Sequence, residues 1–150
     1  MNTRKYLPTF AELIDRLSIV QLKGIFIPEY RDEYAKEIED ILHDIDVCIG
    51  SHEDDRRRPG GGADGISASF IDAEMIRDIV VLAQMNLHIW HNEANFRRGM
   101  KDGNNLELTH SLNGIRNLAK NRIQSKMGGR KDYKVDCLAE DAENWKPTGW

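Results

Sequence analysis

Two runs of polar side chains at helical spacing contain the groups that could bind a small anionic ligand. Within each run every residue has a neighbour three or four positions away, so each run lies on one side of a helix. Amides donate and accept hydrogen bonds, cations neutralise phosphate, and an indole ring offers a flat stacking surface. A groove between the two runs would therefore suit a nucleotide-like ligand. The first run is Asn86, Trp90, Glu93 and Arg97, and the second is Asn113, Arg116, Asn117 and Lys120.

In this interpretation the ligand stacks on Trp90. Its phosphate groups are neutralised by Arg97, Arg116 and Lys120, and Arg16 adds a further cation from an earlier segment. The amides and the carboxylate of the first run recognise polar edges of the ligand. The alternative is that both runs are solvated helix faces. The carboxylate and arginine four residues apart would then form a local surface pair worth about 0.3 kcal/mol.

Two histidines in the same stretch, His88 and His91, have the spacing of a metal-binding pair. A zinc site needs three or four ligands, and no further ligand stands at a diagnostic spacing. We therefore expect single imidazoles that are hydrogen-bonded or exposed.

A second pattern consists of two carboxylate pairs, each with members three residues apart and therefore on one helix face. Two such pairs on adjacent helices can hold Mg²⁺ against a phosphate chain. The pairs are Glu12 with Asp15 and Glu37 with Asp40, separated by 21 residues. They resemble the ExxE…ExxD arrangement of the all-helical MazG-type nucleotide pyrophosphohydrolases, although Asp15 replaces the second Glu. The resemblance implies a Mg²⁺-dependent hydrolase as an alternative function.

The charge of the chain is unevenly distributed, although the net charge of −4 is modest. Residues 9–49 hold 4 basic and 10 acidic side chains, whereas residues 97–134 hold 10 basic and 3 acidic ones. Either the two segments pack beside each other, or the basic one binds an anion. Overall acidity argues against general nucleic-acid binding.

The composition is typical of one soluble domain covering residues 1–150, with 40% hydrophobic and 31% charged residues. The first ten residues contain no apolar segment, and no run is long enough for a membrane span, so we expect neither a secretory signal nor an anchor. The two cysteines, Cys48 and Cys137, form no CxxC motif. Reduced thiols and a cytoplasmic location are therefore expected.

Apolar periodicity predicts an all-α protein, an antiparallel four-helix bundle with short links. A capping box at Thr9 starts the first helix, which Gly24 ends. It has apolar stripes on two sides, which favours a homo-oligomer. The second helix has one narrow apolar seam and is expected to be peripheral. The helices are predicted at 10–24, 28–49, 70–98 and 106–127, with a flexible Gly/Arg-rich loop at 50–66 and an irregular C-terminal extension at 130–150.

The third helix is predicted to carry two neighbouring stripes. One stays apolar to its end at Phe96 and should face the core. The other changes from apolar to polar at Asn86. Because neighbouring residues of a helix differ by only about 100° around its axis, this second stripe borders the core, where polar groups need partners. It consists of Ile79, Ala83, Asn86, Trp90, Glu93 and Arg97. The apolar stripe is Met75, Leu82, Met85, Ile89 and Phe96.

Three segments resemble an uncharacterised all-helical family found in bacterial polysaccharide gene neighbourhoods. They are "LIDRLSIVQLK" at 13–23, Asn86 with "IWHNEANFR" at 89–97, and Asn113 with Arg116 and Asn117. The family implies an all-helical fold but no activity. In general style, the chain is also similar to small helical phage proteins that sequester nucleotide signals.

These observations favour a non-catalytic homo-oligomer that binds a small anionic, nucleotide-like ligand without a cofactor. No activated nucleophile and no complete metal set is evident, which argues against an enzyme. The alternatives are the Mg²⁺-dependent hydrolase and a structural or protein-interaction module whose polar stripes bind another helix.

Overall fold

The computed structural model describes residues 8–57, 71–99, 105–127 and 144–150, and within these ranges the protein is all-α. The elements are helix α1 (Phe10–Phe26), the short 3-10 helix η1 (Pro28–Tyr30), and helices α2 (Arg31–Arg57), α3 (Ala73–Arg97) and α4 (Asn105–Met127). The prediction of an all-α bundle is confirmed. None of the helices in these ranges combines the length and apolar composition that crossing a bilayer requires.

Local capping positions the helices that build the site. The backbone N–H of Glu12 donates to Thr9 Oγ1 at 3.2 Å, and Thr9 N–H donates to Glu12 Oε2 at 3.3 Å, which completes the predicted capping box. Asp72 caps α3 by accepting from Met75 N–H at 2.8 Å. Gly99, with φ of 85°, follows the end of α3, where only glycine adopts this conformation without strain.

Two predicted boundaries are wrong. The first helix does not end at Gly24 but continues to Phe26, and a Cβ at Gly24 would lie 3.9 Å from Tyr34 Cβ. This is an ordinary van der Waals distance, so the packing of α2 would also accept a small side chain at this position. The second helix continues through residues 50–57, where a loop was predicted. The next proline, Pro59, comes only after this segment in the sequence, so no helix-breaking proline interrupts it. Residues 58–66 of the predicted loop lie outside the described residues.

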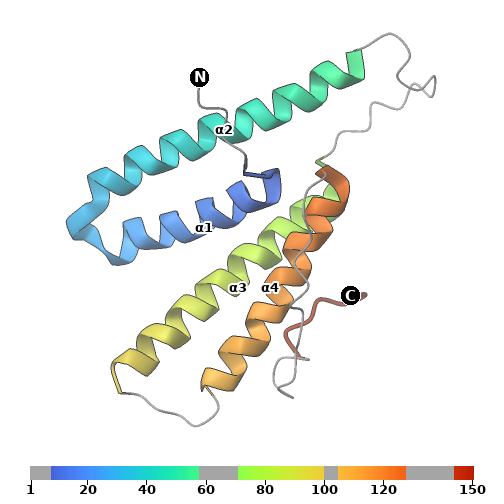
Figure 1. Cartoon of the computed structure of the whole chain (residues 1–150). Coiled ribbons are helices and arrows are strands. Elements are labelled where there is room, and N and C mark those ends of the chain that lie inside the picture. The colour runs from blue at the N-terminus through green and yellow to red at the C-terminus, as the bar shows by residue number, and fades with distance from the viewer. Residues whose placement is uncertain (1–7, 58–70, 100–104, 128–143) are drawn as a thin grey trace.

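The helices form two antiparallel hairpins, α1 with α2 and α3 with α4 (Figure 1). Helix α1 lies between α2 and the α3–α4 pair and contacts all three, whereas α2 packs on no other α-helix than α1 in the described ranges. The outer position of α2 agrees with its narrow apolar seam. Because α1 is covered on both sides within one chain, its two apolar stripes no longer require a second copy.

The core lies where α1, α3 and α4 meet, with α2 adding a smaller layer over α1. On α3 the apolar stripe is buried at Met75, Leu82 and Met85, but Phe96 is 39% exposed. The prediction that this stripe faces the core to its end is therefore wrong, because α3 diverges from α1 toward its C-terminal end (Figure 1). The buried apolar residues are Phe10, Ala11, Leu13, Val20, Ile41, Ile45, Met75, Val81, Leu82, Met85, Leu112, Ile115, Ala119, Ile123 and Met127.

Candidate functional site

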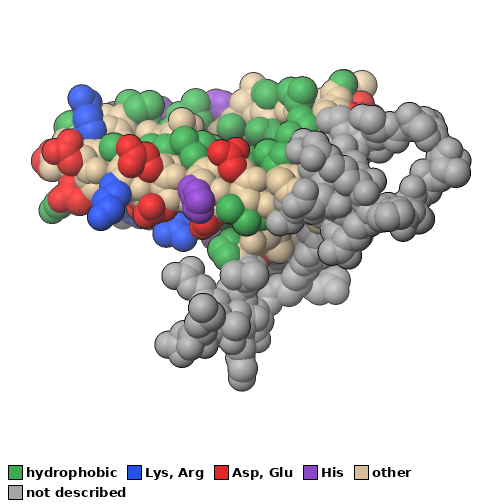
Figure 2. All heavy atoms as spheres, turned by 90° about the horizontal axis from the view of Figure 1, so that it is seen from above, with side chains coloured by type: hydrophobic (Ala, Val, Ile, Leu, Met, Phe, Trp, Pro, Cys, Tyr) green, Lys and Arg blue, Asp and Glu red, His purple; other side chains and the backbone are tan. Residues whose placement is uncertain are grey.

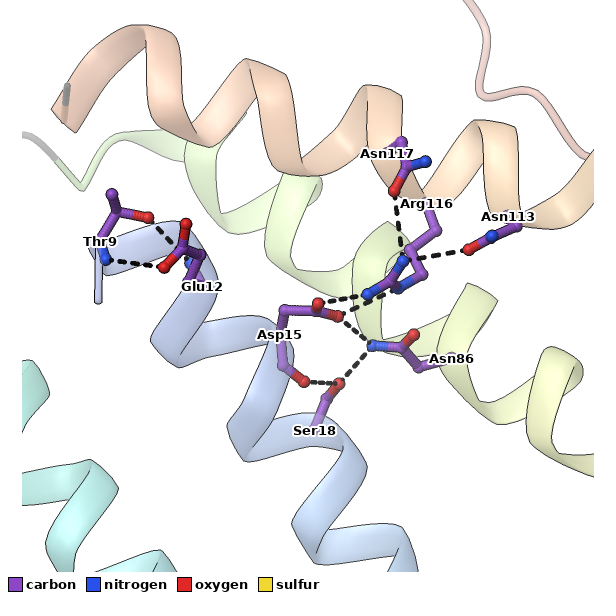
Figure 3. Close-up of polar contacts among 8 residues, drawn as sticks. All are labelled: Thr9, Glu12, Asp15, Ser18, Asn86, Asn113, Arg116 and Asn117. Atoms are coloured by element: carbon purple, nitrogen blue, oxygen red, sulfur yellow. Dashed lines mark hydrogen bonds and ion pairs between the residues drawn. The ribbon is translucent and has the colours of Figure 1, made fainter. Parts of the chain in front are cut away.

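Three charged or polar side chains meet between helices α1, α3 and α4 (Figure 3). Asp15 of α1 and Asn86 of α3 are 7% and 5% exposed. Asp15 Oδ1 accepts from Asn86 Nδ2 at 2.8 Å and from Arg116 Nε of α4 at 3.2 Å. Its Oδ2 accepts from Arg116 Nη2. The side-on contact of the guanidinium with both carboxylate oxygens is the strong, geometrically specific form of this ion pair.

Further polar groups satisfy the remaining donors of these side chains. Ser18 Oγ accepts from Asn86 Nδ2 at 2.6 Å and donates to the Asp15 backbone carbonyl at 2.9 Å. Arg116 Nη1 donates to Asn113 Oδ1 at 3.0 Å and to Asn117 Oδ1 at 3.2 Å. We call these six residues the polar cluster. Its hydrogen bonds run between α1, α3 and α4, so it fixes the three helices relative to one another.

The polar cluster is electrically balanced, because the Asp15 carboxylate compensates the Arg116 guanidinium. The side chains of the pair are only 10% and 20% exposed. In such surroundings charges are stabilised by partners rather than by water, and removal of one partner leaves a costly unpaired charge. The guanidinium directs its Nε, Nη1 and Nη2 groups at protein acceptors, which leaves little of its donor capacity for a phosphate.

The structure brings together four of the nine residues predicted to bind a ligand, namely Asn86, Asn113, Arg116 and Asn117. The other predicted residues have different surroundings. Trp90 stacks on Phe26 of α1, with 6.5 Å between ring centroids and 23° between planes. Lys120 is half-buried on α4.

The remaining predicted cations lie outside the polar cluster. Arg16 donates to Glu37 Oε1 of α2 at 2.8 Å from Nη2, which joins the outer sides of α1 and α2. Arg97 is 81% exposed and its Nη2 lies 4.0 Å from Glu93 Oε2. This is the local i,i+4 surface pair of the alternative interpretation. The first polar run therefore splits between a buried end at Asn86 and a solvated end at Arg97.

The carboxylates of the predicted Mg²⁺ pattern are directed at different partners. Glu12 belongs to the capping box, Asp15 to the polar cluster and Glu37 to the ion pair with Arg16, while Asp40 is exposed on α2. Within the described ranges no three histidine, cysteine or acidic side chains are grouped so that they could hold a metal ion. His88 instead packs edge-on against Trp145, with ring centroids 4.2 Å apart, and His91 is exposed.

A second charged cluster, which the sequence reasoning missed, joins α3, α4 and the C-terminal segment. Asp78 is fully buried, and its Oδ1 accepts from Arg122 Nε at 2.8 Å. Arg122 also donates to Glu74 Oε2 at 3.2 Å and lies over the Trp150 ring, 4.6 Å from its centroid. Asp78 Oδ2 and Trp150 Nε1 are buried without a hydrogen-bond partner. A signal was present, because Asp78 stands within the apolar stripe between Met75 and Leu82 and therefore needs a buried partner.

The C-terminal segment 144–150 thus lies against α3 and α4 of its own chain. Besides the two tryptophan contacts, Arg77 Nη2 donates to the Thr148 carbonyl at 2.8 Å. This part of the irregular C-terminal extension therefore packs on the bundle. Residues 130–143 lie outside the described ranges.

Among the residues that the structure describes, two side chains have a shifted pKa. The hydrogen bond from Lys126 Nζ, at 2.6 Å, and the bond from the Met75 backbone lower the pKa of the Asp72 carboxyl. Burial raises the pKa of the Cys48 thiol, and the negative charge of Asp44 raises it further. Cys48 is therefore held in its unreactive thiol form, because the thiolate is the nucleophile.

Comparison of the chain with protein-family models, with curated proteins and with solved structures found no match.

Proposed function

We propose that the protein is a non-catalytic interaction module that docks a helix of a protein partner on one face of α3. The observation that carries the proposal is an exposed aliphatic stripe on this helix. Val80 is 49% and Leu87 is 42% exposed, and Ile76 is more than half exposed. With Ala83, which is also exposed, they form one continuous stripe spaced 4, 3 and 4 residues apart. We call these four residues the α3 stripe.

The side chains of the α3 stripe are open to contact with a partner, whereas those of the polar cluster are mostly engaged with one another. The side-chain donors of Asn86 and the three guanidinium nitrogens of Arg116 bond to acceptors of the same chain, so a ligand would have to break these hydrogen bonds to use them. The α3 stripe has no covering element among the described residues, although exposed aliphatic side chains gain free energy when removed from water. Contiguous apolar patches of this kind mark interaction sites. An i, i+4, i+7, i+11 stripe is the pattern on which two helices pack.

The proposal can be tested with an apolar fluorescent dye, anilinonaphthalene sulfonate, and two matched variants. Val80→Glu introduces a charge into the α3 stripe. Val47→Glu introduces the same charge on α2 at a valine that is 53% exposed. We expect dye binding to fall strongly in Val80→Glu and to stay near the wild-type level in Val47→Glu. Equal dye binding by all three proteins would contradict the proposal.

A second candidate function, the binding of a small anion, is favoured by one observation at the edge of the polar cluster. Lys120 follows Arg116 by one helical turn and is half-buried, and no ion pair engages it in the described ranges. A phosphate could bind this ammonium group and the exposed edge of Asn113 without breaking the Asp15–Arg116 pair.

The candidate is tested by thermal shift with pyrophosphate and a nucleotide panel, with and without Mg²⁺. If these compounds stabilise the wild type but not Lys120→Ala, the candidate is supported. If none of them shifts the melting temperature of the wild type, the protein does not bind these anions. Loss of the ligand only in the presence of Mg²⁺ would support the hydrolase instead.

A further inference from the structure

The C-terminal segment 144–150, which we call the strap, is anchored on the bundle by the rings of its two tryptophans. At one end Trp145 packs against His88 of α3, with 4.2 Å between ring centroids. At the other end the Trp150 ring covers the Arg122 guanidinium of α4, which lies 4.6 Å from the ring centroid. No residue of the strap is buried, so it lies on the surface. It is found beside α4 (Figure 1), on a different side of the molecule from the charged outer surface of α2 that Figure 2 shows.

A tight turn of the strap places the Trp150 ring on α4. The backbone N–H of Trp150 donates to the Pro147 carbonyl at 3.2 Å, which closes a β-turn. The third residue of this turn, Gly149, has φ of 89°. A positive φ at this position is the mark of a type II turn and favours glycine, because a Cβ would be strained there. The contact of Trp150 with the bundle therefore depends on one glycine.

The guanidinium under Trp150 is held in place by the bundle itself and does not need the strap. The fully buried Asp78 accepts from Arg122 Nε at 2.8 Å, and Glu74 accepts from Arg122 Nη2 at 3.2 Å. These bonds fix the guanidinium between α3 and α4. A planar guanidinium stacks on aromatic faces, which distinguishes arginine from lysine. The bundle therefore presents a prearranged surface for an aromatic ring.

Trp150 occupies this surface at a cost that favours its release. Its Nε1–H is buried without a hydrogen-bond partner among the described residues. A buried polar group without a partner is less favourable than the same group in water. Release of the strap returns the indole N–H to water, which offsets part of the ring contact that is lost. The docked and released states of the strap are therefore closer in free energy than a fully satisfied contact would make them.

We propose that the surface around His88 and Arg122 is a binding site for a tryptophan-bearing peptide segment of a partner protein, and that the strap occupies it reversibly in the same chain. The strap itself shows the chemistry that fits: an irregular segment whose tryptophan rings cover the imidazole and the guanidinium. A tethered segment has a high effective concentration, so the strap competes with the partner segment and is an autoinhibitory contact. This inference goes beyond the docking function of the α3 stripe, because it uses residues that the stripe does not include.

The release of the strap is tested by fluorine NMR of the full-length chain labelled with 5-fluorotryptophan. Gly149→Ala strains the turn, whereas Thr148→Ala is the matched control, because Thr148 is exposed and alanine keeps its backbone carbonyl. In Gly149→Ala we expect the Trp145 and Trp150 resonances to move toward that of free 5-fluorotryptophan, and in Thr148→Ala to stay at the wild-type positions. The Trp90 resonance should not move in either variant, which shows that the bundle is folded. Unmoved Trp145 and Trp150 resonances in Gly149→Ala would overturn the reversible strap.

The binding site is tested by fluorescence anisotropy of a fluorescein-labelled peptide of residues 144–150 added to the same full-length chains. Because the released strap leaves the site to the peptide, Gly149→Ala should bind it about fivefold more tightly than the wild type, the ratio expected for a strained Cβ at positive φ. Thr148→Ala should bind it as the wild type does, and a peptide with both tryptophans replaced by Ala should not bind. Equal binding by Gly149→Ala and the wild type, or equal binding of the two peptides, would overturn the proposal.

Discussion

Replacement of Arg116 by Met tests whether the polar cluster holds the three core helices together. The substitution keeps most of the length and apolar stem of the side chain but removes the guanidinium. Asp15, 7% exposed, then keeps only its bond from Asn86, so a nearly buried carboxylate loses the charge that compensates it. Breaking a buried ion pair from one side costs about 3–5 kcal/mol. Because the two side chains retain 10% and 20% exposure, we expect the lower end, about 3 kcal/mol.

The assay is equilibrium unfolding in urea followed by circular dichroism, with the free energy taken from linear extrapolation. Arg16→Ala is the control, because it breaks an exposed pair with Glu37 and should cost less than about 1 kcal/mol. The double variant Asp15→Leu/Arg116→Met should recover most of the stability, since an apolar replacement of both partners leaves no buried charge. The reasoning is refuted if Arg116→Met is as stable as Arg16→Ala, or if the double variant is less stable than the single one.

Three further outcomes follow from the contacts described above. The Asp72 carboxyl should titrate below its usual pKa of 3.8 in an NMR titration, and Lys126→Ala should raise its pKa toward that value. Because the lowered pKa in the folded state favours the charged form, the interaction stabilises the fold above pH 3.8, and this stabilisation is lost as the pH falls through the lowered pKa. An unchanged pKa of Asp72 in Lys126→Ala would contradict the assignment. The Cys48 thiol should react slowly with iodoacetamide at pH 8, measured in a Cys137→Ser background, and Asp44→Asn should accelerate the reaction because one of the two causes of its raised pKa is removed; a slower reaction would contradict this. Trp150→Ala should lower the free energy of unfolding by about 1 kcal/mol, because the contact with Arg122 is lost. Trp150→Phe should lower it less, because phenylalanine keeps a ring and removes the buried N–H that has no partner. Equal losses in the two variants would show that the contact of the ring with Arg122 is not the source of the stabilisation.

Local signals in the sequence predicted most of the fold. The capping box at Thr9 and the glycine after α3 act within a few residues, so their effect can be read without knowing the tertiary structure. The end of α2 could not be read in this way. The charged sequence from residue 50 onward has no apolar periodicity, and its composition alone suggested a loop.

The candidate site was predicted only in part, because its partners are distant in the sequence. The change from apolar to polar character at Asn86 correctly indicated a polar residue at the core edge. Its partner, Asp15, lies 71 residues away and was assigned to a different pattern, the carboxylate pair with Glu12. Arg116 was expected to neutralise a ligand, but a carboxylate of the same chain occupies it. Such pairing depends on how α1 crosses α3 and α4, which helical periodicity does not determine.

The exposure of the α3 stripe also could not be predicted from the sequence, because it depends on the tertiary structure. The sequence pattern placed Ala83 on the stripe that borders the core, together with Asn86 and Trp90. Exposure of Val80 and Leu87 follows only once the positions of α1 and α4 around α3 are known. Both neighbours lie on the other sides of the helix, so no helix of the described ranges covers this one.

Binding of the apolar dye to the dilute unmodified chain, alongside Val80→Glu and Val47→Glu, tests the central claim most directly. We expect the wild type and Val47→Glu to bind the dye alike, and Val80→Glu to bind it much more weakly. The two valines have similar exposure, 49% and 53%, so only the surface on which each lies distinguishes them. If Val80→Glu and Val47→Glu bind the dye equally, the α3 stripe is not a docking surface.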